Sequence, residues 1–143
     1  MTPAQPDAAT TTATDVVDVL VYSDDVTTRE QVRRAVGRRA AADLPRIRWT
    51  EAATHAGVVQ KAHEGDFALL VLDGEAAKVG GMAVARQLKT EMYQCPPVLV
   101  LTARPQDAWL ATWAQADAIV QQPIDPITMQ QAVADLLRGG TTR

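Results

Sequence analysis

The sequence has little of what marks secreted, membrane-bound or nucleic-acid-binding proteins. Its single cysteine, Cys95, excludes an intrachain disulfide and makes a reducing compartment the default expectation. No apolar run approaches the roughly 18 residues of a membrane span, and residues 1–14 lack the cationic start and apolar stretch of a signal peptide. The net charge of −3 argues against a nucleic-acid footprint. We therefore expect a cytoplasmic protein that binds neither nucleic acid nor a membrane.

The chain has the length and composition of one folded domain. Its 143 residues suit a single domain, and a hydrophobic share of 47% is enough to build a full core. Residues 1–14 are low in complexity, which predicts a disordered N-terminal tail. Residues 139–143 begin with two glycines, which predict a helix stop and a frayed end. The folded part is therefore predicted to span residues 15–138.

Strand-like and helical patterns alternate along this folded part. Apolar runs rich in β-branched residues predict strands at 16–22, 47–50, 67–72, 98–101 and 118–120. Helical spacing follows each of them, at a segment capped by Thr27 or Thr28 and at 54–63, 82–92, 106–115 and 126–138. Five βα repeats predict an α/β fold with a doubly wound, flavodoxin-like, five-stranded parallel sheet in the order 2-1-3-4-5 and helices on both faces.

Polar side chains follow the predicted strands, where sheets of this kind bind their ligands. These residues are Ser23, Asp24, Asp25, Asp73, Thr102 and Gln122. Carboxylates that converge from two strand ends repel each other and favour a cation between them. A few oxygen ligands with open water positions suit Mg²⁺. The sequence thus predicts a polar site at the carboxyl edge of the sheet.

Four stretches together resemble one known family. They are "VLVYSDDVTTREQV", "LLVLDGEAAKVGGMAVARQLK", "PPVLVLTARPQDAW" and "ADAIVQQPIDPITMQQAVADLL". In order and spacing they resemble the receiver domain of response regulators, and the resemblance covers essentially all of residues 16–138. It implies a signalling module of two-component systems, which would take a phosphoryl group from a histidine kinase.

The resemblance also implies roles for single residues. Asp73 matches the phospho-accepting aspartate, Thr102 the hydroxyl residue that contacts the phosphoryl group, and Glu75 the position whose backbone carbonyl helps to hold Mg²⁺. Aligned through Arg29, Ser23 and Asp24 match the usual acidic pair, and Asp25 is the residue after it. A slip of one position would make Asp24 and Asp25 the pair. Asp24, Asp73 and the Glu75 carbonyl are the implied metal ligands.

Several positions depart from the family pattern. Where family members have a lysine just before the proline that follows the last strand, this chain has Gln122, whose neutral amide cannot neutralise charge. Where they have the first acidic residue of the metal site, this chain has Ser23. Where family members commonly have an aromatic residue in the last strand, this chain has Ile119. Lys78 could supply the missing cation, although an exposed loop lysine is the simpler interpretation. We therefore predict that Mg²⁺ binds weakly and that phosphorylation of Asp73 is weak or absent.

Each site residue also has a plain structural interpretation. Asp73 could end a strand and cap a turn, and Thr102 could be a turn former. Asp24 and Asp25 could be acids at a helix N-terminus, where the helix dipole favours them. Gln122 could be a polar turn residue.

Trp109 and Trp113 suggest how the protein is used. They lie four positions apart on one short predicted helix and share a face. Either both lie in the core or one is a partly exposed anchor for a partner. We predict a partner surface of these two residues and Ile119, on the face made by the segments 106–115, 118–120 and 126–138.

Three functions compete at this point. The first prediction is a single-domain, atypical receiver, not an enzyme, that signals through a protein partner or a homodimer. The alternative is a receiver phosphorylated on Asp73 by a histidine kinase with Mg²⁺. A small enzyme or nucleotide-binding protein on the same fold comes third, because no glycine-rich phosphate loop follows the first strand.

Overall fold

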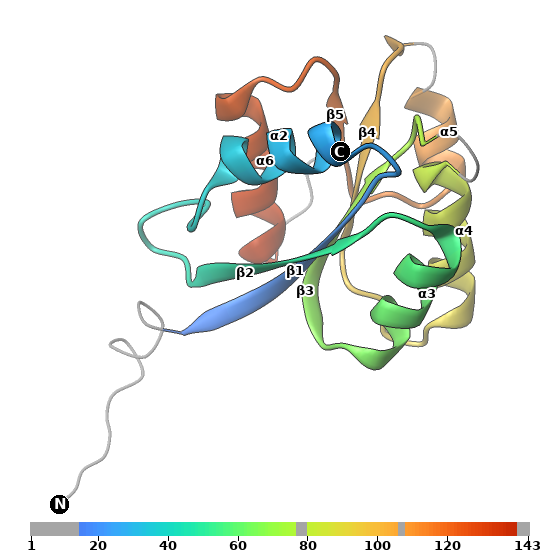
Figure 1. The fold of residues 1–143 in the computed structure, drawn as a ribbon, viewed down its shortest axis with the longest axis horizontal. Helices are drawn as coiled ribbons and strands as arrows, with labels where there is room; N and C mark the ends of the chain where they lie inside the picture. Colours follow the sequence, from blue (N-terminus) through green and yellow to red (C-terminus); the bar gives the residue numbers. More distant parts are fainter. Residues whose placement is uncertain (1–14, 77–79, 106–107, 140–143) are drawn as a thin grey trace, which may run out of the picture.

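The computed structural model describes residues 15–76, 80–105 and 108–139, in which strands and helices alternate (Figure 1). The elements are β1 (Val16–Tyr22), α2 (Val26–Val36), β2 (Arg46–Ala52), α3 (His55–Glu64), β3 (Phe67–Asp73), α4 (Gly81–Glu91), β4 (Val98–Thr102), α5 (Ala108–Trp113), β5 (Ala118–Gln121) and α6 (Pro126–Leu137). The segments 1–14 and 140–143 lie outside the described residues, so the two predicted tails stay predictions.

The strands form one parallel sheet in the order β2-β1-β3-β4-β5, which confirms the predicted fold class. Tyr22 of β1 pairs with Leu72 of β3, and Asp73 pairs with Leu101 of β4. The carboxyl ends of β1, β3 and β4 therefore meet at one edge. The apolar runs of β3 and β4 are buried because helices cover both faces of a parallel sheet.

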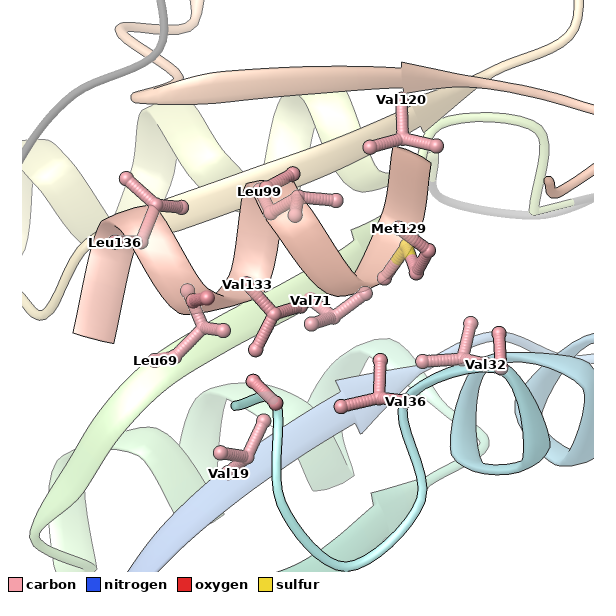
Figure 2. Packing of buried hydrophobic residues seen from close by; sticks show 14 of the residues in the cluster. Val19, Val32, Val36, Leu69, Val71, Leu99, Val120, Met129, Val133 and Leu136 are labelled. Carbon is pink, nitrogen blue, oxygen red and sulfur yellow. The ribbon is translucent and has the colours of Figure 1, made fainter. Parts of the chain in front are cut away.

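Two apolar cores lie on the two faces of the sheet. Helices α2 and α6 cover one face, and α3, α4 and α5 cover the other (Figure 1). Figure 2 shows Val133 and Leu136 of α6 beside the strand residues Leu69, Val71 and Leu99. Burial of these side chains stabilises the domain by roughly 1.5–3 kcal/mol for each large aliphatic group.

The helix starts correct one prediction. Asp25, and not Thr27 or Thr28, caps α2, and its carboxylate accepts the backbone N–H of Thr27 at 2.9 Å. Both threonines lie inside the first turn of the helix, whereas Asp25 has the extended backbone that a capping residue requires. Asp125 caps α6 in the same way, ahead of Pro126 in the first turn.

Among the helices of the described ranges, none is both long enough and apolar enough to cross a bilayer.

Candidate functional site

Asp73 lies at the end of β3, and only 4% of its surface is exposed. Its Oδ2 accepts a hydrogen bond of 2.8 Å from the hydroxyl of Ser23. Its Oδ1 accepts the backbone N–H of Glu75 at 2.9 Å and the side-chain amide of Gln122 at 3.3 Å. These three donors are neutral, so they satisfy the buried carboxylate without cancelling its charge.

Ser23 is fully buried at the end of β1, and its hydroxyl has a fixed direction. The oxygen accepts the backbone N–H of Asp25 at 3.0 Å, so the proton of the hydroxyl is the group that reaches Asp73. The Ser23 carbonyl accepts Nη1 of Arg29 at 2.6 Å, and Arg29 also forms an ion pair of 2.8 Å with Glu51. Arg29 thereby ties the end of β1 to β2.

Two glycines allow the chain to close around Asp73. A Cβ atom at Gly74 would lie 2.5 Å from the carbonyl oxygen of Leu101, and one at Gly81 would lie 2.7 Å from the carbonyl carbon of Asp73. Both distances are to backbone, which has little room to give. Any side chain at these positions would push the loop after β3 away from β4, or α4 away from Asp73.

The electrostatics of the site are set by the negative charge of Asp73. No lysine or arginine of the described ranges forms an ion pair with Asp73. Burial raises the pKa of the Tyr22 phenol, and the negative charges of Asp24 and Asp73 raise it further. Tyr22 therefore stays neutral, and both carboxylates lie within electrostatic reach of its ring.

The metal ligands implied by the sequence form a sparse set. Asp24 is exposed at the same edge of the sheet as Asp73. Across the ranges that the structure describes, no cluster of three or more acidic, histidine or cysteine side chains suits a metal ion. The resemblance implies two carboxylates and the backbone carbonyl of Glu75 as donors, and Mg²⁺ can be held by one or two carboxylates if it keeps its waters.

The remaining predicted residues take different positions. Thr102 is buried one residue beyond Leu101, the pairing partner of Asp73. The Glu75 carboxylate accepts the backbone N–H of Ala103 at 3.3 Å and so links the loops after β3 and β4. Asp25 is engaged as the cap of α2. Lys78 lies outside the described residues.

A second group of predicted residues lies on the surface of α5 and β5. Trp109 is 67% exposed, Trp113 48% and Ile119 40%, so the two tryptophans do not both belong to the core. The guanidinium of Arg86 in α4 lies 4.6 Å from the centre of the Trp113 ring, and its Nη1 donates to the Trp113 carbonyl at 2.9 Å. Arg86 and the tie made by Arg29 were not predicted, because nothing in the sequence placed either beside its partner.

Comparison with known proteins decides the family. No family model matches the chain. It is 51% identical over 120 residues to uncharacterised response regulatory proteins from two strains of Mycobacterium tuberculosis, covering 84% of this chain and 90% of each relative. The chain belongs to the response regulators. The resemblance expected from the sequence is thus confirmed, and with it a place in two-component signalling.

Solved structures agree with this response regulator in fold. A LuxR-family two-component response regulator from Aurantimonas has a TM-score of 0.75 at 22% identity, covering 90% of each chain. The Vibrio cholerae chemotaxis protein CheY4 has a TM-score of 0.69 at 18% identity, covering 85% of this chain and 98% of its own. At such low identity these likenesses establish the receiver fold alone.

Proposed function

We propose that this response-regulator receiver signals through protein contacts and that Asp73 accepts a phosphoryl group weakly or not at all. The observation that carries the proposal is the 2.8 Å hydrogen bond from Ser23 to Asp73. A neutral hydroxyl holds the oxygen of the acceptor at the position where the family pattern has an acidic residue. The domain acts in the cytoplasm and has no enzymatic turnover of its own.

The charge balance of the site supports a weak acceptor. A phosphoryl group adds about −1.5 to −2 charges at neutral pH. Transfer of that group needs cationic partners for the charge on its oxygens. Gln122 reaches Asp73 at 3.3 Å but brings only an amide, and Ser23 brings no carboxylate to hold a metal. The hydrogen bonds from Ser23 and Gln122 satisfy the unphosphorylated Asp73 carboxylate, but they would not neutralise the added charge of a phosphoryl group on it.

The donor set fits a weakly held Mg²⁺. Asp24, Asp73 and the carbonyl of Glu75 would hold it, and the ion would supply positive charge beside the oxygens of a transferred phosphoryl group. The protein's own part is to fix the position of the Asp73 carboxylate through the Ser23 and Glu75 hydrogen bonds. Ser23 in place of an acid removes one negative charge from the set, which lowers its affinity for the ion.

The partner surface of this proposal is the α5–β5–α6 face with Trp109, Trp113 and Ile119. Tryptophan offers a large apolar area with few rotatable bonds, so little entropy is lost when it docks. The contact of Arg86 with Trp113 holds that ring in place at the surface. Ile119 has no ring whose rotation could report a state of Asp73. Binding of a protein partner, or of a second copy in a homodimer, is therefore constitutive.

A receiver that a histidine kinase phosphorylates on Asp73 is the second candidate. The observation in its favour is the place of Asp73, at the end of β3 beside Thr102 at the end of β4. Under this alternative the Gln122 amide would donate a hydrogen bond to the phosphoryl oxygens, and Mg²⁺ alone would neutralise their negative charge.

The test is incubation of the full chain with a small phosphodonor and Mg²⁺, followed by intact mass. We expect little or no gain of one phosphoryl group over the time in which an ordinary receiver is fully modified. The Asp73→Asn protein is the matched control. Rapid and stoichiometric modification that this substitution abolishes would overturn the proposal in favour of the second candidate.

A further inference from the structure

Positive charge is concentrated in one part of this acidic chain. Residues 29–48 hold seven of the fourteen lysines and arginines and only two of the seventeen acidic residues. The basic residues are Arg29, Arg33, Arg34, Arg38, Arg39, Arg46 and Arg48. The net charge of the whole chain is −3, so this local excess is not a matter of composition.

Three of these arginines line one open pocket at β2, an edge strand of the sheet. The pocket has a volume of about 450 Å³, within the size range of small-molecule sites. Its lining residues are Val16, Arg38, Arg46, Ile47 and Arg48. Val16 and Arg46 are paired at the starts of β1 and β2. The pocket therefore lies at the amino end of the strands, away from Asp73 at their carboxyl end.

The backbone around the pocket is held firmly. The loop after α2 returns along β2, where the N–H of Ile47 donates to the carbonyl of Arg38 at 2.7 Å. The indole N–H of Trp49 donates to the carbonyl of Gly37 at 3.1 Å. Leu44, from the same loop, is buried in the core beneath α2 and α6. The backbone that carries the three arginines is thus fixed, so binding a ligand would need to order only their side chains.

Two of the three arginines have charge to offer a ligand. Arg48 forms a two-pronged ion pair with Asp18, at 2.6 and 3.0 Å. Arg38 and Arg46 form no ion pair with any other residue that the structure describes. Like charges that line one pocket repel each other, and an anion between them would remove that repulsion.

We propose that this pocket binds a compact ligand that carries a chain of phosphate groups. The planar fork of arginine matches phosphate oxygens with two parallel hydrogen bonds, which favours phosphate over a simple halide. The neighbouring hollow is lined by Asp18 and Asp66, so the positive field ends within a short distance. A long polyanion such as nucleic acid would meet those acids, whereas an inorganic polyphosphate or the phosphate chain of a nucleotide would not.

The test is calorimetric titration of the full chain at low salt with tripolyphosphate, a nucleoside triphosphate and inorganic phosphate. We expect one saturable site for tripolyphosphate and weaker binding of inorganic phosphate. Tighter binding of the nucleoside triphosphate would identify a nucleotide as the source of the phosphate chain, and equal binding would identify the inorganic chain. Arg38→Ala and Arg46→Ala should each weaken binding about tenfold, because each removes charge-assisted hydrogen bonds.

Two further variants decide whether the effect is local. Arg34→Ala removes the same charge from an exposed position of α2 that is paired with Glu30, and it should change the affinity less than about twofold. Asp18→Asn releases Arg48 and should tighten binding. The proposal is overturned if no saturable binding is found, if Arg34→Ala weakens binding as much as Arg46→Ala, or if a single-stranded oligonucleotide binds more tightly than tripolyphosphate.

Discussion

The hydroxyl of Ser23 donates a hydrogen bond of 2.8 Å to Oδ2 of Asp73, fifty positions further along the chain. The bond joins the carboxyl ends of β1 and β3 inside the molecule, and the backbone N–H of Asp25 completes it from the other side. The family pattern has an acidic residue at position 23, which would repel the Asp73 carboxylate. In this chain Ser23 instead donates a hydrogen bond to it.

Ser23→Ala should destabilise the fold. The change leaves Oδ2 of a buried carboxylate and the N–H of Asp25 without their partner, and we expect the free energy of unfolding to fall by about 1–3 kcal/mol. Urea denaturation measures the change. Thr28→Ala, which removes an exposed hydroxyl 3.4 Å from Asp25, is the control and should cost less than about 0.5 kcal/mol. Equal losses in the two variants would mean that the Ser23 bond has no special role.

Gln122→Lys should raise phosphorylation of Asp73. The new ammonium group would lie where the amide now reaches the carboxylate at 3.3 Å, and it would offset the charge of the phosphoryl group. Adding Ser23→Asp should raise Mg²⁺ affinity as well, so the double variant should be modified faster than either single one. Intact mass after treatment with a phosphodonor gives the readout. Gln121→Lys adds the same charge at an exposed neighbouring position, and an equal gain there would show a non-specific charge effect.

Trp109→Ala should abolish partner binding or homodimerisation without changing the thermal melt. The residue is 67% exposed, so its loss should alter stability by no more than about 0.5 kcal/mol. Sedimentation measures self-association, and calorimetry measures binding of a partner once one has been purified. Tyr93→Ala removes an aromatic ring from the connection between α4 and β4, and its binding should match the unaltered chain. Unchanged binding in both Trp109→Ala and Trp113→Ala proteins would place the partner surface elsewhere.

The cap of α6 should contribute to pH dependence. The backbone and hydroxyl of Thr128 donate to Asp125 and lower the pKa of its carboxyl. The folded state therefore binds this proton less tightly than the unfolded state. The stability so gained is present above the ordinary carboxyl pKa and is lost as the pH falls through the lowered value.

Asp125→Asn keeps a capping oxygen but does not titrate in this range. We expect the unaltered chain to be the more stable at neutral pH and the difference between the two urea midpoints to narrow in acid. A difference that stays constant with pH would contradict the assignment of this effect to Asp125.

The strands were the most predictable part of the fold. Strands β3 and β4 are buried on both faces of the sheet, and a strand of this kind appears in the sequence as a continuous apolar run. The structure also brings Ser23, Asp73 and Gln122, which follow three different strands in the sequence, into hydrogen-bond contact. The cap of α2 was predicted wrongly, because Thr27, Thr28 and Asp25 are all good capping residues and only the backbone conformation separates them.

The direction of side chains at the site was not predictable from the sequence. The Ser23–Asp73 bond depends on the relative register of β1 and β3, and the stacking of Arg86 on Trp113 depends on how α4 packs beside α5. Both are contacts between segments distant along the chain. Composition and spacing named most of the participants but not the pairs that they form.

The three tryptophans lie in two separate parts of the molecule, so their fluorescence can report on each part. Trp49 is part-buried beside the loop that carries Arg38, with its indole N–H fixed to the Gly37 carbonyl. Trp109 and Trp113 are exposed on α5, which packs beside α4. Single-tryptophan proteins made by replacing the other indoles with phenylalanine would therefore give an intrinsic fluorescence signal either from the β2 edge of the sheet or from α5, so that events at each surface can be followed without a label.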